Sequence, residues 1–237
     1  METSTIQRLK SKACKLIEGR SLQAGRVLEV RAWEPGTLIE VDLHLPMADM
    51  MDWNAVPYIK FKVADLTYRD YTPSGWDAET CTCTLFIHTA HNGPGSRWAR
   101  MLKKDDEVNY VKIKPTNQSP AATPAVVALG DESSLGHLLA LQQLTLPAAR
   151  FSGALLMDNE QHRSLLTQYF RTPLEAISRK DSYGHHTLME WVLKQSYTLK
   201  DTIFCLSGND VMVSQLRKQL RALGYENTQL LAQGFWS

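Results

Sequence analysis

The sequence has no long apolar run, and this lack argues against a helical membrane protein. No stretch of the 237 residues approaches the ~20 consecutive apolar residues that a transmembrane helix needs. Residues 1–5 also lack the basic segment that precedes an apolar segment in a secretory signal. We therefore expect a cytoplasmic protein with no membrane partner.

The chain also lacks an excess of charge of either sign. Its 26 basic and 25 acidic residues leave a formal net charge of +1, whereas a protein that attracts nucleic acid through its overall field is strongly basic. We predict no nucleic-acid partner. The hydrophobic content of 43% and the charged content of 22% are ordinary for a globular chain with a sizeable core.

Cysteine is scarce, and its spacing does not favour a metal centre. The four cysteines are Cys14, Cys81, Cys83 and Cys205. Cys81 and Cys83 form a C-x-C pair rather than the C-x-x-C pairs of zinc sites, and no second pair follows. His185 and His186 are adjacent, and neighbours in a regular element rarely bind one ion, so they indicate a loop or surface pair. We predict free buried thiols and no metal site.

The first half of the chain alternates between apolar and polar residues, the pattern of strands that are buried on one face. Segments of this kind cover residues 26–31, 38–45, 58–63, 81–88 and 107–113. Helical spacing occurs over 5–20 and 96–102, and residues 73–75 read as a turn. Several short strands at close spacing predict an antiparallel β-barrel with an N-terminal helix.

The pattern changes after a proline-rich, polar stretch over residues 115–124, which is typical of a linker. Continuous apolar runs then alternate with helical segments, which predicts buried parallel strands between helices. The runs cover 125–130, 151–157 and 202–208, and the helices cover 134–144, 188–194 and 211–223. We predict a barrel domain over 1–116 and a small α/β domain over 117–237.

A first candidate site is Arg69-Asp70-Tyr71-Thr72, which follows a strand. In an extended segment Arg69 and Tyr71 face the same side. Arg69 offers a fork of donors suited to phosphate, Tyr71 a flat face for a ring, and Thr72 a hydroxyl for a ring heteroatom. Taken alone, the segment could equally be an ordinary surface strand end.

A second candidate is the stretch from His88 to Ala99. Gly93 and Gly95 let the backbone approach a ligand, and Ser96 can cap the helix that follows. Alone it is a glycine turn before a capped helix. Together, the two segments supply an anion site at a helix N-terminus, a cation and an aromatic platform within one domain.

These segments resemble motifs of a known family. Arg69 to Thr72 resembles the flavin signature R-x-Y-(S/T) of the ferredoxin–NADP reductase superfamily. Residues 93–99 are similar to the G-P-x-S-x-W-A motif of its siderophore-interacting proteins, the ferric-siderophore reductases. Residues 129–135 resemble their A-G-D-E-T-A-L motif, and residues 234–237 their G-Y-W ending. Four motifs in this order cover most of the chain.

The resemblance implies FAD on the barrel. Arg69 would hold the pyrophosphate, Tyr71 would stack on the isoalloxazine, and Thr72 would hydrogen-bond near N5, while Trp98 could instead be a core residue. The implied cofactor-binding residues are Arg69, Asp70, Tyr71, Thr72, His88, Asn92, Gly93, Pro94, Gly95, Ser96 and Trp236.

The resemblance also implies a nicotinamide-nucleotide cleft at the carboxyl end of the first parallel strand. Its residues would be Gly130, Asp131, Glu132, Ser133, Ser207 and Gly208. Residues 207–210 depart from the family's A-G-E motif, so NADH, NADPH and a ferredoxin all stay open as donors.

The implied reaction passes electrons from NAD(P)H through the flavin to a ferric siderophore, with no obligatory protein acid or base. Ferric catecholates are anionic, so a basic pocket would attract them. Candidate cations are Lys60, Lys62, Arg97, Arg100, Lys112 and Lys114. Two alternatives stay open. One is a flavin oxidoreductase with another acceptor. The other is a non-catalytic module that carries an iron chelate.

Overall fold

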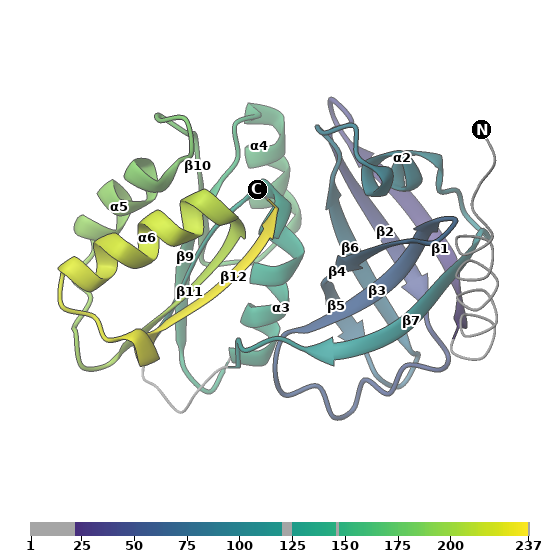
Figure 1. The fold of residues 1–237 in the computed structure, drawn as a ribbon, viewed down its shortest axis with the longest axis horizontal. Helices are drawn as coiled ribbons and strands as arrows, with labels where there is room; N and C mark the ends of the chain where they lie inside the picture. The colour runs from purple at the N-terminus through teal and green to yellow at the C-terminus, as the bar shows by residue number, and fades with distance from the viewer. Residues whose placement is uncertain (1–21, 120–124, 146, 237) are drawn as a thin grey trace, which may run out of the picture.

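The computed structural model describes residues 22–119, 125–145 and 147–236. The helix predicted over 5–20, Cys14 and residues 120–124 of the predicted linker lie outside these ranges. The described chain forms a β-barrel and an α/β unit that lie side by side (Figure 1). This order confirms the predicted fold class. In the described residues, no helix is long and apolar enough to cross a membrane.

The barrel is a sheet of seven antiparallel strands in the order β4-β3-β7-β1-β2-β6-β5. Its strands are β1 Gln23–Trp33, β2 Leu38–His44, β3 Pro57–Ala64, β4 Thr67–Tyr71, β5 Pro73–Asp77, β6 Thr82–His88 and β7 Glu107–Pro115. The five predicted strands are confirmed. The turn predicted over 73–75 was wrong, because Pro73 begins the outermost strand β5, where its missing N–H costs the ladder little.

The barrel closes around the first candidate motif. Strands β4 and β5 stand at opposite ends of the sheet order, yet only Thr72 separates them in the chain. The sheet must therefore curl until its two edges meet at this residue. Fully buried side chains such as Phe61 and Tyr110 fill the interior, and helix α2 (Pro94–Met101) packs beside β3, β4 and β6.

The α/β unit has five parallel strands in the order β10-β9-β8-β11-β12. These are β8 Ala125–Asp131, β9 Arg150–Leu156, β10 Leu174–Ile177, β11 Thr202–Asn209 and β12 Leu230–Trp236. The helices are α3 Leu135–Thr145, α4 Glu160–Tyr169, α5 His185–Leu193 and α6 Asp210–Ala222, with 3-10 turns at Glu132–Ser134 and Asn227–Gln229. The pair His185–His186, which we expected in a loop or on the surface, begins α5, and His185 is half-buried.

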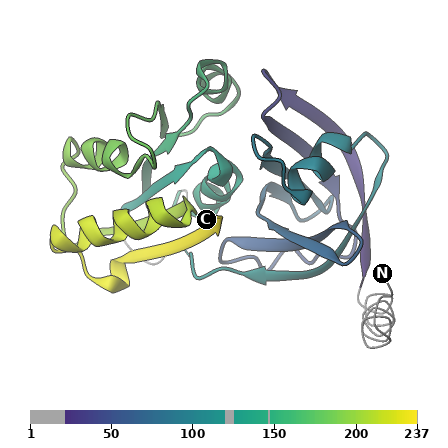
Figure 2. The same ribbon diagram turned by 45° about the horizontal axis from the view of Figure 1, so that its top comes forward.

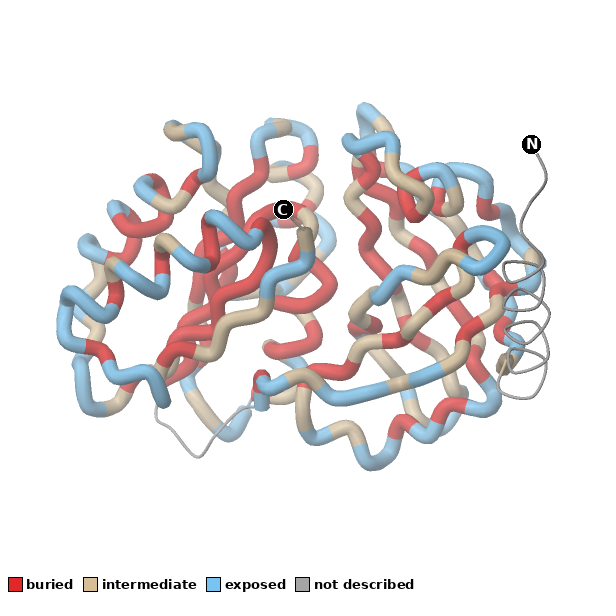
Figure 3. The backbone as a smooth tube through the Cα atoms, in the orientation of Figure 1, coloured by how far each residue is buried: buried red, intermediate tan, exposed pale blue. Residues whose placement is uncertain are grey.

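Helices cover both faces of the parallel sheet, and this layering positions the site. Helix α3 contacts β8 and β9 on one side and the barrel strands β5 and β6 on the other. Leu138 and Leu141 of α3 share one buried cluster with Trp33 and Phe86 of the barrel. Helices α5 and α6 cover the opposite face, and Figure 3 shows the buried strands between the helical layers. The barrel and the α/β unit thus meet across α3.

Candidate cofactor site

A cavity of about 260 Å³ lies between the barrel and the α/β unit. It is lined by Arg69, Asp70, Tyr71, Thr72, Phe86, Ile87, His88, His91, Gly93, Gly95, Ser96, Ser133, Gly136, His137, Phe235 and Trp236. The two candidate segments from the sequence, which are separate in the chain, therefore face one space. The C-terminal strand also points into this region between the two units (Figure 2).

An aromatic platform forms one wall. Tyr71 stacks on Trp98 of α2, with ring centroids 5.7 Å apart and planes inclined by 16°. Trp98 also packs on Phe61, so it belongs to the barrel core, one of the two roles that we left open. Burial raises the pKa of Tyr71 to about 12, so its ring stays neutral. The platform is therefore held rigidly by packing from within the barrel.

The cavity has donors for an anion. Gly93 is the N-cap of α2 and Pro94 its first residue, so the expectation that Ser96 caps the helix was wrong. No acidic residue occupies the first turn, and the first intrahelical bond runs from Arg97 to Gly93, which leaves the Gly95 and Ser96 amides without intrahelical partners. Arg69 donates to its neighbour's carbonyl at 2.7 Å and makes no ion pair within the described chain.

Thr72 connects the barrel to the α/β unit. Its hydroxyl lies 3.2 Å from Nδ1 of His137 on α3, and Nε2 of His137 lies 2.8 Å from the side-chain oxygen of Gln118. His137 is 1% exposed and Gln118 is 0% exposed. Burial lowers the pKa of His137 to about 3, so its imidazole is neutral. The back wall of the cavity is therefore a buried, uncharged hydrogen-bond network.

Glu132 joins the two units at a second point. Its carboxylate contacts Nδ1 of the buried His162 on α4, and its other oxygen lies 3.9 Å from Nε2 of His88 on β6. Nε2 of His162 lies 3.2 Å from the Trp33 carbonyl on β1. Burial lowers the pKa of His88, a predicted cofactor residue that lines the cavity. Glu132 thus holds barrel and α/β unit together.

The predicted nucleotide residues meet where the strand order of the parallel sheet reverses. Gly130 pairs in register with Ser207, and β8 and β11 are neighbours whose chains continue in opposite directions across the sheet. The Asp131 carboxylate accepts from the amide of Ser133 at 3.0 Å and from the amide of Asn209 at 2.8 Å. Burial raises the pKa of Asp131. These amides, which could face a phosphate, are bonded to the protein's own carboxylate.

The position of the Asp131 carboxylate explains why residue 208 is a glycine. Its φ of +125° lies in the left-handed region, and a β-carbon there would lie 2.6 Å from the Asp131 carboxylate. Glycine is therefore required by both conformation and space. The buried hydroxyl of Ser207 has no hydrogen-bond partner in the described parts of the chain.

The C-terminal residues complete the cavity. Trp236 donates from Nε1 to Ser133 Oγ at 3.0 Å, and its ring lies 4.9 Å from that of His91 on the barrel. Phe235 lies 5.3 Å from His137 between ring centroids. The side chain of Trp236 lines this cavity. Its role in holding a cofactor stays a prediction.

Several predicted residues do not line the cavity. Asn92 accepts from Arg97 through its carbonyl and from Arg100 through its side chain, so both arginines hold the loop before α2. Lys60 forms an ion pair with Asp70 at 2.7 Å. The predicted cofactor and substrate residues absent from the lining are Asn92, Pro94, Lys60, Lys62, Arg97, Arg100, Lys112 and Lys114, and of the predicted nucleotide residues only Ser133 belongs to it.

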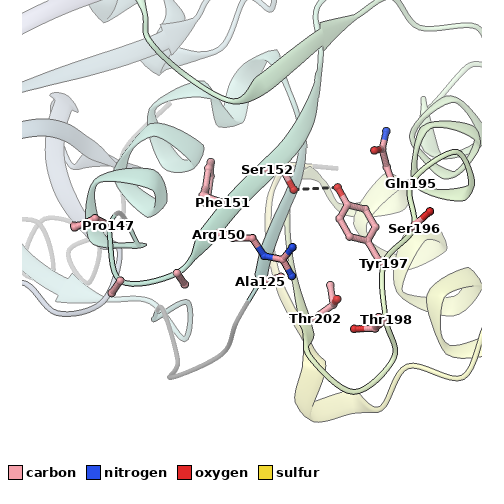
Figure 4. Close-up of a pocket in the computed structure, with 12 residues that line it drawn as sticks. Ala125, Pro147, Arg150, Phe151, Ser152, Gln195, Ser196, Tyr197, Thr198 and Thr202 are labelled. Atoms are coloured by element: carbon pink, nitrogen blue, oxygen red, sulfur yellow. Dashed lines mark hydrogen bonds between the residues drawn. The ribbon is translucent and has the colours of Figure 1, made fainter.

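A larger hollow of about 780 Å³ lies at the other edge of the parallel sheet (Figure 4). It begins at the first residues of β8, β9 and β11, namely Ala125, Arg150 and Thr202, and contains a bond between Ser152 and Tyr197. Open α/β sheets bind ligands at the carboxyl edge instead. The cavity at Tyr71 is therefore the candidate site.

Sequence reasoning missed several residues of this cavity. Phe86, Ile87, His91, Gly136, His137 and Phe235 line it without having been predicted. His137 had a visible signal, because it is a lone histidine in the apolar helix segment 135–141. The prediction of free thiols is confirmed for Cys81, Cys83 and Cys205, although Cys81 is only half-buried. In the described residues, no group of three or more His, Cys, Asp and Glu could hold a metal ion.

Comparison with known proteins identifies the fold. No protein-family profile and no curated protein matches the sequence. The siderophore-interacting protein from Acinetobacter baumannii matches with a TM-score of 0.74 and 11% identity, over 91% of this chain and 90% of that chain. The siderophore-interacting protein SipS from Aeromonas hydrophila matches with a TM-score of 0.71 and 16% identity, over 91% of this chain and 91% of that chain. The chain therefore shares the two-domain fold of these solved structures.

The same fold extends to a reductase solved with its cofactors. A ferredoxin NADP+ reductase from Neisseria gonorrhoeae, with bound FAD and NADP, matches with a TM-score of 0.64 and 14% identity, over 92% of this chain and 98% of that chain. The structural resemblance that the four sequence motifs implied is confirmed. At these identities, the likeness to the ferredoxin–NADP reductase fold concerns architecture, and the chemistry must be argued from the cavity.

Proposed function

We propose that this protein is an FAD-dependent reductase of ferric siderophores. The observation that carries the proposal is the cavity where the Tyr71 platform, the Arg69 guanidinium, the open N-terminus of α2 and the Thr72 hydroxyl face one space. A flat ring with a charged phosphate tail needs these groups together. A bound flavin supplies the ability to take electrons as a pair and return them singly, as ferric iron requires.

The residues present fit this cofactor. Arg69 has no carboxylate partner in the described chain, and the first turn of α2 has no acidic residue, so both are available to a pyrophosphate. Tyr71 would carry the ring, and Thr72 would meet its edge. His88, Gly93, Gly95 and Ser96 would hold the phosphates. Asp70, Asn92 and Pro94 would fix the surrounding loops, and Trp236 would cover the site. We propose domains over 1–116 and 117–237, with the cofactor on the first.

The siderophore assignment rests on likeness and charge. Two of the matching structures are named siderophore-interacting proteins. Ferric iron is harder than ferrous iron, so an oxygen-rich chelator holds the reduced metal less well, and reduction releases it. The proposed cations Lys60, Lys62, Arg97, Arg100, Lys112 and Lys114 lie outside the cavity lining, where they would attract an anionic chelate from solution.

The electron donor is either NAD(P)H or a ferredoxin-type protein. The superfamily fold and the meeting of Gly130, Asp131, Ser133, Ser207 and Gly208 at the sheet reversal support a nicotinamide nucleotide. A specific observation favours the protein donor. The Asp131 carboxylate already occupies the amides of Ser133 and Asn209, and the partner of Glu132 is His162, so a nucleotide would have to displace internal bonds.

Anaerobic reduction tests the proposal. Purified protein is supplied with FAD, reduced with NADH, NADPH or reduced ferredoxin, and mixed with a ferric catecholate. We expect reoxidation of the flavin together with Fe(II), which a ferrous indicator reports. Turnover of quinones but not of ferric chelates indicates the alternative of a flavin oxidoreductase with another acceptor. A protein that binds the chelate without taking up flavin is the non-catalytic module, and the reductase proposal is then wrong.

A further inference from the structure

A buried chain of hydrogen bonds runs from the cavity into the α/β unit. Thr72 Oγ1 lies 3.2 Å from His137 Nδ1, and His137 Nε2 lies 2.8 Å from Gln118 Oε1. Gln118 Nε2 in turn donates to the carbonyl of Leu206 at 3.2 Å and to that of Leu231 at 2.9 Å. The chain connects the cavity wall to the backbone of β11 and β12.

The inner end of the chain fixes the direction of the hydrogen bonds that Gln118 makes. Backbone carbonyls can only accept, so the amide nitrogen of Gln118 must face Leu206 and Leu231. Its oxygen therefore faces His137, and a flipped amide would place three acceptors together. Because Gln118 Oε1 accepts, Nε2 of His137 must carry a proton and donate.

The neutral charge of His137 fixes the direction of the remaining hydrogen bond, which joins Nδ1 of His137 to the hydroxyl of Thr72. The ring is 1% exposed, and the described residues give it no carboxylate partner. Burial lowers its pKa to about 3, so the neutral form is present at neutral pH. A neutral imidazole with a proton on Nε2 has none on Nδ1. The bond between Nδ1 and Thr72 therefore requires that the hydroxyl donate.

We infer that His137 is a positioning residue that accepts the only hydroxyl proton of Thr72, so that Thr72 offers the cavity lone pairs alone and recognises a ring edge that bears a hydrogen-bond donor. This inference rests on the proposed flavin function for its ligand. Flavin N5 bears a hydrogen in the reduced form and none in the oxidised form. Thr72 thus favours binding of reduced over oxidised flavin.

The first test needs no flavin. Long-range nitrogen–proton correlation spectra of the ¹⁵N-labelled full chain report which ring nitrogen of each histidine is protonated, and the spectrum of His137→Leu assigns the His137 signals. If that variant does not fold, selective labelling and assignment through neighbouring residues replaces it. We expect His137 to be protonated on Nε2 only, at pH 7. Protonation on Nδ1, alone or together with Nε2, overturns the inference.

The second test measures the midpoint potential of FAD in the protein against a reference dye. An ordinary hydrogen bond changes an equilibrium about fivefold, which corresponds to about 20 mV for a two-electron couple. We expect Thr72→Val to lower the potential by about this amount and Thr72→Ser to retain the original value. His137→Leu frees the hydroxyl proton and lowers the potential at least as much. Thr84→Val, a barrel threonine bonded to Asp42 outside the cavity lining, is the matched control.

The outcomes separate the two proposals. An unchanged potential in a flavin-loaded Thr72→Val protein overturns the inference while leaving the flavin site standing. A protein that takes up no FAD overturns the proposed function, and the protonation of His137 still decides whether Thr72 presents only lone pairs. A merely structural role for His137 would alter the unfolding midpoint without moving the potential.

Discussion

Arg69→Ala is the substitution that bears most directly on the phosphate side of the cavity. Arg69 is exposed, lines the cavity, and has only the carbonyl of Tyr68 as a partner in the described structure. A hydrogen bond to a charged group contributes about 1.5–3 kcal/mol. Because Arg69 is exposed and solvent screens its charge, we take the lower end, about 1.5–2 kcal/mol. This corresponds to an FAD dissociation constant about 10- to 30-fold higher.

The assay is fluorescence titration of FAD into the purified protein at two salt concentrations. We expect Arg69→Ala to weaken binding by this factor, to reduce its salt dependence, and to leave the unfolding midpoint in urea unchanged. Arg26→Ala is the matched control, because Arg26 is an exposed barrel arginine that pairs with Asp105 outside the cavity lining. If both variants bind FAD as tightly as the unaltered protein, Arg69 does not hold the pyrophosphate.

Three further substitutions test the structure around the site. Gly95→Val places a β-carbon on the Tyr71 hydroxyl, so we expect a loss of about 1–3 kcal/mol in urea unfolding and loss of flavin uptake; a normal flavin complex would contradict this packing. His162→Ala removes the shorter of the two histidine contacts of the buried Glu132 carboxylate, and we expect a loss of about 3–5 kcal/mol, against little change if the contact is incidental. Burial lowers the pKa of His137 from its ordinary value of 6.5 to about 3, so below pH 6.5 the unfolded chain takes up a proton that the folded chain does not. The contribution of His137 to the free energy of unfolding is therefore complete above pH 6.5 and falls by about 1.4 kcal/mol per pH unit toward pH 3. In urea unfolding between pH 7 and 4.5, the free energy of unfolding of His137→Leu should fall with pH less steeply than that of the unaltered protein, by this slope. An equal pH dependence of the two proteins would show that His137 is not the titrating group.

The strongest elements of the fold could be predicted from the sequence because their patterns are local. Alternation marked the barrel strands, and the apolar run at 125–130 marked β8. Strand β5 was missed because Pro73 and Gly75 are turn residues, whereas here they extend an edge strand. The elements α4, β10 and β12 were missed because their apolar residues follow neither a helical nor a strand spacing clearly. Their secondary structure depends on packing against the neighbouring strands.

The candidate site also contains some residues that could be predicted from the sequence and others that could not. The groups on single segments, Arg69 to Thr72 and Gly93 to Ser96, could be predicted because the chemistry is local, and they do line one cavity apart from Pro94. The partners of Thr72 could not, because His137 is 65 positions further along the chain and reaches it only through the docking of α3 on the barrel. Tertiary packing therefore decides which way the Thr72 hydroxyl points.

The visible absorption spectrum of the purified protein tests the flavin site most directly. The spectrum is recorded after incubation with FAD and removal of the excess, then under anaerobic conditions with a reduced donor, and finally with a ferric chelate. We expect flavin bands in a one-to-one ratio with the chain, bleaching on reduction, and return of the bands with the chelate. A protein that remains colourless after incubation with FAD contradicts the flavin site at Tyr71.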